Sequence, residues 1–399
     1  MSSVGHHLVR RALDVSSQAQ AHFSSLQEID VASKSQEDHD IHPRNLALLC
    51  IGAIWVTIIA FMAMMSAISY TYGDVIGTLA MIETPTAAAF EVESTEASEE
   101  VDAPLLSDEQ KTEKKKTVES SLYIVKQKPI TAKMRTAVKH LKAQGGRLAR
   151  FRGLHVLVIY GTIHSLIVNL LAPRAGHSLA RPIVAVIASI AMCRLHMTWT
   201  HIVISAPSTK HWWQRIPPVK AAKNIIVPTA IYAIAAESAI YIPSRLFATA
   251  HRTLWEKYSE DPSRHSEGIK VAIATFIGIV LIALSIVLLV VVPANVSLKR
   301  IEASMLPEEH EAIVPFDRTF AGKVKPEILG GSGAVGMLDA WKTFDRSARL
   351  RLLKLYAKIL AIQFVCLVSF VCLVRAELAF FIGDNVGELG KVVQSGFKI

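Results

Sequence analysis

Ionisable side chains inside long apolar stretches are the residues of this sequence that could do chemistry. Arg194 lies 12 residues into the apolar stretch 182–205, and Glu237 lies 12 residues into the stretch 225–243. A charge inside a membrane span is costly, so by default it marks a candidate solute or proton site. If the two stretches are consecutive antiparallel spans, equal offsets place both charges at one depth. The sequence therefore predicts an Arg194–Glu237 ion pair, either a packing clamp or part of a solute site.

Other polar residues lie in the neighbouring apolar stretches. His196 and His201 are five residues apart, which is too far round a helix for a two-histidine metal site. We interpret them as packing or interface histidines, with His201 also a candidate for the solute site. His164 and Asn169 lie in the stretch 154–173 and are candidates to line a polar cavity.

The sequence has no pattern typical of a catalytic, cofactor or metal site. There is no catalytic triad, no pair of carboxylates with catalytic spacing, and no nucleotide-binding glycine motif. The four cysteines all lie in apolar stretches and form no metal-binding spacing: Cys50, Cys193, Cys366 and Cys372. We therefore expect no enzymatic activity, no cofactor and no bound metal.

Composition indicates a membrane protein. The 399 residues are 51% hydrophobic, and the mean hydropathy is +0.35. A soluble chain of this length rarely has such an apolar excess, so the excess is expected to face lipid. The formal net charge of +9 comes mostly from residues that flank the apolar stretches. That placement favours membrane topology over nucleic-acid binding.

The elements that must position these residues are six predicted transmembrane helices. A span needs about 20 apolar residues, and the sequence provides six such stretches: 46–73, 154–173, 182–205, 225–243, 271–292 and 352–374. Basic residues are denser in the connections between spans one and two, three and four, and five and six. The positive-inside rule places those connections on the inside and both termini on the outside.

The chain is expected to be an all-α, polytopic bundle with tails and one insert. The segment 91–116 is acidic and then basic, with few large apolar residues, and it is predicted to be disordered. The predicted organisation is an N-terminal tail (1–45), helix 1 with its extension (46–82), the disordered insert (83–129), a surface helix with helices 2–4 (130–243), a loop with helix 5 (244–293), an inside loop with an amphipathic helix (294–350), and helix 6 with the C-terminal tail (351–399).

Two inside connections contain amphipathic segments at matching positions. In the first, Met134, Ala137, Val138 and Leu141 share one helical face, and two glycines at 145 and 146 end the helix. In the second, the segment 336–344 has a similar apolar stripe. Both are either membrane-surface helices or ordinary loop helices. A unit of span, inside loop with helix, and span then occurs three times, beginning near residues 46, 182 and 271.

This repeat resembles the mitochondrial carrier family. The residues after the fifth apolar stretch, Pro293, Asn295 and Arg300, resemble the signature that closes each odd-numbered carrier helix. Phe151 and Gly153 resemble the aromatic-x-glycine that opens the next span. The resemblance implies a carrier-like bundle. Asn295 and Leu298 stand where the signature has an acid and a base, so the ring of salt bridges that closes one side of a carrier is not expected at those positions.

Segments such as RLHMTWTHIVIS and GMLDAWKTFDRSARLRLLKLYAKI resemble a family of filamentous-fungal multi-span membrane proteins commonly labelled "ubiquitin carrier protein". That resemblance covers most of the chain beyond the N-terminal tail. The label does not fit the chemistry, because ubiquitin conjugation needs an accessible activated cysteine in a soluble domain, and Cys50 lies in a span.

Two functions remain open on these observations. One is a divergent carrier-like transporter of a small-molecule solute in an organelle membrane, with the mitochondrial membrane favoured and the endoplasmic reticulum or vacuole as alternatives. The other is a non-transporting scaffold or adaptor that recruits protein partners through its loops. In both, the lipid bilayer surrounds the spans and no nucleic acid is bound.

Overall fold

The fold is helical apart from one short two-stranded ladder. The structure is a computed structural model that describes residues 43–84, 87–91, 122–126, 128–172, 179–258, 265–325 and 329–382. Within these residues, strands β1 (Ala87–Glu91) and β2 (Leu122–Lys126) pair antiparallel. They lie at the two ends of the predicted disordered insert. Residues 85–86, 92–121 and 127 of that insert, the N-terminal tail before Pro43 and the C-terminal tail after Ile382 fall outside the described residues.

The chain is a multi-pass membrane protein by the length and composition of its helices. Five helical stretches are long and apolar enough to cross a membrane: Leu49–Ile82, Arg147–Leu171, Val219–Tyr258, Ser266–Ser304 and Arg346–Phe380. Two further helices, α6 (Ala180–Ala191) and α7 (Cys193–Ile204), meet at a 62° bend and make a sixth span if counted together. The described residues thus contain five or six candidate spans.

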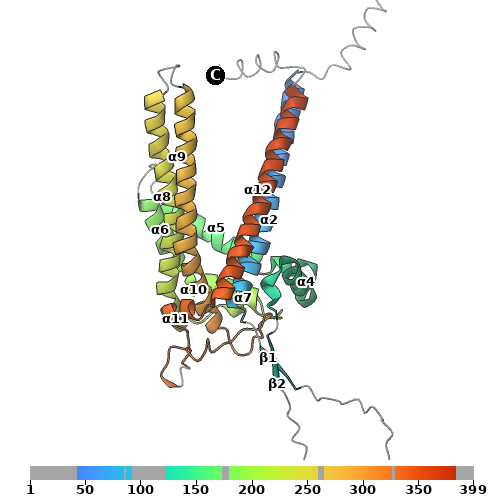
Figure 1. Cartoon of the computed structure of the whole chain (residues 1–399), viewed down its shortest axis with the longest axis vertical. Coiled ribbons are helices and arrows are strands. Elements are labelled where there is room, and N and C mark those ends of the chain that lie inside the picture. Colours follow the sequence, from blue (N-terminus) through green and yellow to red (C-terminus); the bar gives the residue numbers. More distant parts are fainter. Residues whose placement is uncertain are drawn as a thin grey trace, which may run out of the picture. The chain divides into compact units, whose positions relative to one another are not determined.

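The chain divides into two compact units, which are described separately. One unit comprises Met1–Ser66 and Ile362–Ile399. Its described part consists of residues 43–66 of α2 (Pro43–Ile68) and residues 362–382 of α12 (Arg346–Ile382), here called the α2–α12 pair. The two helices lie side by side (Figure 1), with the Phe61 and Phe370 rings stacked at 4.1 Å between centroids. The Thr57 hydroxyl donates to the Glu377 carboxylate at 2.5 Å.

The second unit, Ala67–Ala361, contains the remaining elements. Beyond those named above, they are η1 (Ser69–Ile76), α3 (Gly77–Ile82), η2 (Ile130–Ala132), α4 (Met134–Gly145), η3 (Arg147–Phe151), α5 (Leu154–Leu171), η4 (Trp212–Arg215), η5 (Val219–Ala221), α8 (Ala222–Tyr258), α9 (His265–Ile286), η7 (Val287–Val291), α10 (Val292–Ser304) and α11 (Met337–Lys342). Helices α8 and α9 form a long hairpin (Figure 1).

The expectation that the fifth span ends at Pro293 is wrong. The helix that begins as α9 continues through Pro293 to Ser304. A π-helical turn, η7, directly precedes the proline. Proline removes one amide donor and its ring collides with the carbonyl four residues earlier, and a widened i→i+5 turn relieves that collision. Likewise, α8 passes through both Pro228 and Pro243 instead of ending at the second.

The third predicted span is not one straight helix. It breaks at Met192, whose φ of −100° and ψ of 12° lie outside the α-helical region. The halves on either side of Met192 therefore point in different directions. Arg194 belongs to the second half, α7, whereas α6 is the half that packs along α8.

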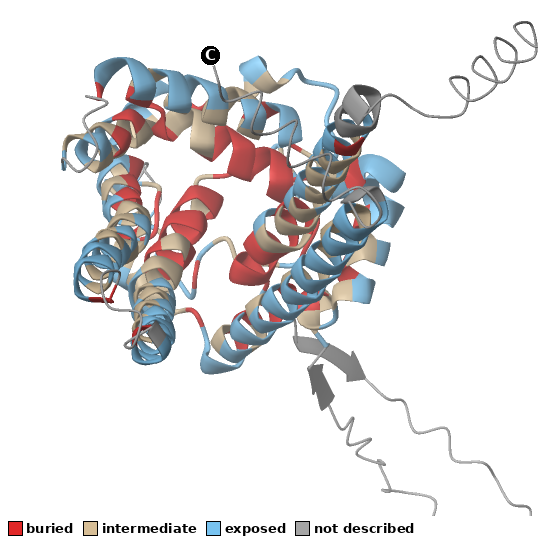
Figure 2. Cartoon of the chain, turned by 90° about the horizontal axis from the view of Figure 1, so that it is seen from above, coloured by how far each residue is buried: buried red, intermediate tan, exposed pale blue. Residues whose placement is uncertain are grey.

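The first predicted amphipathic helix forms. Helix α4 runs from Met134 to Gly145, and the residues Ala137 and Leu141 on its predicted apolar face are buried. Gly146 follows with φ 76°, which only glycine adopts easily, so it ends the helix. Buried residues gather in α7 and α10, whereas the long helices are mostly exposed, as expected of surfaces that face lipid (Figure 2).

Candidate functional site

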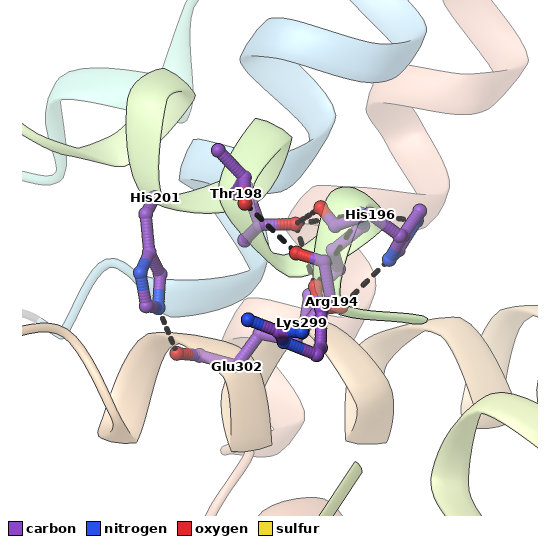
Figure 3. A network of polar contacts seen from close by, with 7 residues as sticks. Arg194, His196, Thr198, His201, Lys299 and Glu302 are labelled. Carbon is purple, nitrogen blue, oxygen red and sulfur yellow. Dashed lines mark hydrogen bonds and ion pairs between the residues drawn. The ribbon is translucent and has the colours of Figure 1, made fainter. Parts of the chain in front are cut away.

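The strongest concentration of buried charge lies where α7 meets α10. Lys299 and Glu302 are one helical turn apart on α10 and are 4% and 0% exposed. Opposite them, α7 presents His196 and Thr200 (Figure 3). These four residues are here called the polar network. Lys299 and Glu302 lie in the helical stretch Ser266–Ser304, which is long and apolar enough to cross a membrane, whereas His196 and Thr200 lie in α7, which counts as a span only together with α6. Unpaired charge inside a membrane is expensive.

The Glu302 carboxylate is the centre of this network. One oxygen, Oε1, is 2.6 Å from Nδ1 of His196. The other, Oε2, accepts from the Thr200 hydroxyl at 2.5 Å and lies 3.7 Å from Nζ of Lys299. Both oxygens are therefore hydrogen-bonded, which is the condition under which a fully buried carboxylate can stay charged.

Lys299 fixes the tautomer of His196. Its Nζ lies 3.0 Å from Nε2 of His196 and 3.0 Å from the Thr200 hydroxyl. An ammonium group has only donors, so Nε2 of His196 must accept. The imidazole proton then lies on Nδ1 and is donated to Glu302. The network is thus a lysine–carboxylate pair joined through a neutral histidine.

Aromatic rings enclose the lysine. Its ammonium lies 4.1 Å from the centroid of the Trp199 ring, a cation–π contact. The Trp199 indole donates to the Tyr70 hydroxyl at 3.2 Å, and that hydroxyl donates to the Arg152 carbonyl at 2.5 Å. The close approach explains Gly153, where φ is 76° and an added Cβ would lie 3.2 Å from Trp199.

Arginines cap the end of α7 beyond the network. Arg152 donates to the carbonyls of Ile202 and Ser205. Arg215 donates to the Ser205 hydroxyl at 2.5 Å, and partial burial lowers the pKa of its guanidinium. The last carbonyls of a helix have no intrahelical partner, so these cations satisfy them. The ring of His201 lies against the backbone of α10, with Nε2 2.8 Å from the Glu302 carbonyl.

A polar cavity of about 360 Å³ borders this end of α7. Its lining includes His201, Lys210, Arg215, Glu309 and His310. Burial, and then the positive charge of Arg215, lower the pKa of His310. Lys210 bonds Glu309 at 2.9 Å, and this hydrogen bond lowers the pKa of the exposed Glu309 carboxyl. The cavity therefore contains both signs of charge.

The predicted Arg194–Glu237 ion pair does not form. The Arg194 guanidinium donates instead to the Pro217 carbonyl, at 2.9 Å from Nε and 2.7 Å from one terminal nitrogen. The bend at Met192 is the reason, because it turns α7 away from the α6–α8 contact where Glu237 lies. Asn169 is also separate from the polar network, and its side-chain oxygen accepts from Arg181 at 3.4 Å.

Of the residues that carry the carrier resemblance, Arg300 and Phe151 have clear structural partners. The buried Arg300 donates to the Met81 carbonyl and the Thr343 hydroxyl, each at 3.0 Å. Phe151 stacks near Tyr70, with ring centroids 6.5 Å apart. Asn295 has a buried side-chain oxygen with no hydrogen-bond donor among the described residues. Pro293 follows the π-helical turn described above.

Sequence reasoning missed the polar network. It treated Lys299 as an inside-facing charge and His196 as a packing residue, because the fifth span was expected to end at Pro293. The available signal was a lysine and a glutamate at i and i+3 directly after the most apolar span. That spacing points to one helical face only if the helix continues past the proline.

The site joins a lysine, a carboxylate, a histidine and a hydroxyl in one hydrogen-bonded network. Among the described residues, no group of three or more histidine, cysteine or acidic side chains could hold a metal ion. No protein-family model matches the sequence, no curated protein matches it, and no solved structure matches its fold. The polar network and its surroundings are thus the basis for a functional proposal.

Proposed function

We propose that this multi-pass membrane protein is a divergent carrier-like transporter of a small solute in an organelle membrane. In this proposal the polar network closes one end of the helical bundle and opens during the transport cycle. That end includes the connections 206–224 and 294–350, which are those predicted to lie on the inside. The mitochondrial membrane is the favoured location, with the endoplasmic reticulum or vacuole as alternatives.

One observation carries the proposal: Lys299 and Glu302 are buried at the end of the candidate span Ser266–Ser304 and bond the partly buried His196 of α7. Apolar residues of similar volume would pack such a position as well or better, because desolvation offsets the attraction between the charges. A buried charge pair is therefore more readily explained by a need to break and re-form it. Ionisable residues within spans commonly mark solute or proton pathways.

A second candidate function is a membrane scaffold or adaptor that recruits protein partners through its loops. The observation that favours it is the complete pairing of the Glu302 carboxylate, which suits a permanent clamp. The connection after α10 is also fixed to the helices: the amide of Ile313 donates to the Ile204 carbonyl at 2.9 Å. A scaffold needs this rigidity and does not need a transport cycle of opening and closing.

The test is reconstitution of the full chain into liposomes with a panel of radiolabelled solutes. The transporter proposal expects uptake above protein-free liposomes for at least one solute. It also expects the double variant Lys299→Met with Glu302→Leu to fold and to lose that uptake, since an apolar pair cannot reopen to water. Uptake equal to wild type in a folded double variant would leave the network with a clamp role only.

Localisation of a tagged full-length copy tests the membrane assignment. Co-localisation with a mitochondrial marker would agree with the favoured location. Residence in the endoplasmic reticulum or vacuole would contradict the carrier-like assignment but leave the transport question to the liposome assay.

A further inference from the structure

A narrow cleft lies between α6 and α8, away from the polar network. It has a volume of about 310 Å³. Each helix contributes one stripe at helical spacing: Leu179, Pro182, Ile183, Val186 and Ile187 from the start of α6, and Ile234, Glu237, Ser238, Tyr241 and Ile242 from α8. The walls are almost entirely apolar. Several of these side chains are exposed, including Ile183 and Ile187, so the cleft is accessible from the lipid side.

Glu237 is the one charged residue of this lining. Its carboxylate makes no hydrogen bond and no ion pair with any described residue. His164 and Arg181 act on it only through longer-range electrostatics. His164 bonds the Ala185 carbonyl and Ser189 hydroxyl, and Arg181 bonds Asn169. Glu302 and Glu377, in contrast, each accept a short hydrogen bond within the protein.

The chemistry of the cleft selects its ligand. A small metal ion needs several oxygen ligands, and this lining provides one carboxylate and two hydroxyls, those of Ser238 and Tyr241. A neutral apolar molecule would leave the carboxylate without a counter-charge. A molecule with a positive charge on an apolar body satisfies both the carboxylate and the walls. We propose that the α6–α8 cleft binds lipophilic organic cations, with Glu237 as their counter-charge.

Lipophilic organic cations would be the substrate class of the proposed transporter, and only their transport rests on that proposed function. Their binding to the α6–α8 cleft does not depend on it. Glu237 would serve as the recognition residue, Ser238 and Tyr241 as neighbouring polar contacts, and the isoleucines as the apolar surface. The apolar part of the cation reaches the cleft from the lipid phase, where such cations concentrate.

Ethidium, an aromatic cation, is a suitable probe for the purified full chain in detergent. Fluorescence polarisation should detect saturable binding to wild type. Glu237→Gln should weaken binding by about tenfold or more, corresponding to roughly 1.4 kcal/mol, and Glu237→Asp should retain most of it. Tetraphenylphosphonium should displace ethidium, whereas tetramethylammonium, which has the charge without the apolar body, should not.

Glu256→Gln is the matched control, because Glu256 is an exposed carboxylate on the same helix outside this cleft. It should bind ethidium as wild type does. Circular dichroism and thermal unfolding must show that Glu237→Gln is folded. Equal ethidium affinity in folded Glu237→Gln and wild type would overturn the proposal, as would equal losses in the Glu237 and Glu256 variants.

Ethidium uptake into liposomes that enclose DNA separates the two proposals. Binding and uptake that both depend on Glu237 support both. Binding without uptake above protein-free liposomes retains the cleft as a cation site and rejects these cations as substrates. Uptake of another solute by a protein that does not bind ethidium rejects the cation site and leaves the transport function standing.

Discussion

Glu302 and Glu377 are both carboxylates in long apolar helices, but their surroundings differ. Glu302, in the polar network, is fully buried and has a histidine, a threonine and a lysine around it. Glu377, in the α2–α12 pair, accepts one hydrogen bond from Thr57, and its other oxygen is buried without a donor among the described residues. The number of partners, not the residue type or the hydropathy of its segment, separates the two regions.

The difference follows from how many helices meet at each place. Several elements of the second unit surround α10, so a carboxylate there can collect partners from α7 and from its own helix. Within the α2–α12 pair, the described partner of α12 is one helix, and Glu377 accepts one hydroxyl from it, that of Thr57. A buried carboxylate with three partners, such as Glu302, is suited to gating or clamping a contact between helices. A single hydrogen bond, such as that of Glu377, is suited to aligning two helices.

The largest expected effect is that of breaking the polar network at its centre. Glu302→Gln leaves the Lys299 ammonium buried without its counter-charge, which should destabilise the protein by about 3–5 kcal/mol. We expect poor yield and a much lower unfolding temperature in detergent. The double variant Lys299→Met with Glu302→Leu should recover most of that stability. A single variant as stable as wild type would mean that the network is not closed in the folded protein.

A loss of similar size is expected at Arg300, which extends the comparison to a buried cation without a carboxylate partner within salt-bridge distance. Arg300→Met removes donors to the Met81 carbonyl and Thr343 hydroxyl, together with contacts to the Phe320 ring at 4.7 Å. Each charge-assisted hydrogen bond contributes about 1.5–3 kcal/mol. Arg300→Lys should not restore stability, since an ammonium cannot reach both acceptors in the guanidinium geometry. Chemical denaturation of the purified variants measures both.

Removing the hydrogen bond of the α2–α12 pair should have a modest effect. Thr57→Val deletes the donor to Glu377 and should cost about 0.6 kcal/mol, and no more than about 1.7 kcal/mol, as found for hydrogen bonds between transmembrane helices. Thr57→Ser retains the hydroxyl and serves as the control. A loss as large as that of Glu302→Gln would show that Glu377 is as dependent on its partner as Glu302 and would remove the contrast.

The smallest effect is expected at the edge of the polar cavity, where the pH dependence of stability is the probe. The folded pKa of His310 is lowered, so the unfolded chain takes up its proton first as pH falls through about 6.5. Protonation therefore favours the unfolded state, and wild type loses stability through this group. The variant His310→Gln does not have this loss. The unfolding temperature of the variant minus that of wild type should therefore increase as the pH falls from about 7 to about 5. A constant difference across this range would contradict the assigned pKa direction.

Local periodicity determined the helical, multi-pass class of this protein and its first surface helix. The apolar stretches, the buried face of α4 and the glycine that ends it could all be predicted, since each depends on residues within a few turns of one another. Gly153 was identified from a family resemblance, and its positive φ and contact with Trp199 gave the physical reason.

Tertiary structure alone decided which charges meet. The 62° bend at Met192 separated Arg194 from Glu237 and brought α7 to α10. The π-helical turn before Pro293 let α10 continue, and one extra residue in a turn rotates every later side chain by about 100° around the axis. Neither a bend nor an added residue per turn can be read from hydrophobic spacing. The partners of Lys299 and Glu302 therefore followed from the direction and rotation of two helices, which the packing of the whole unit sets.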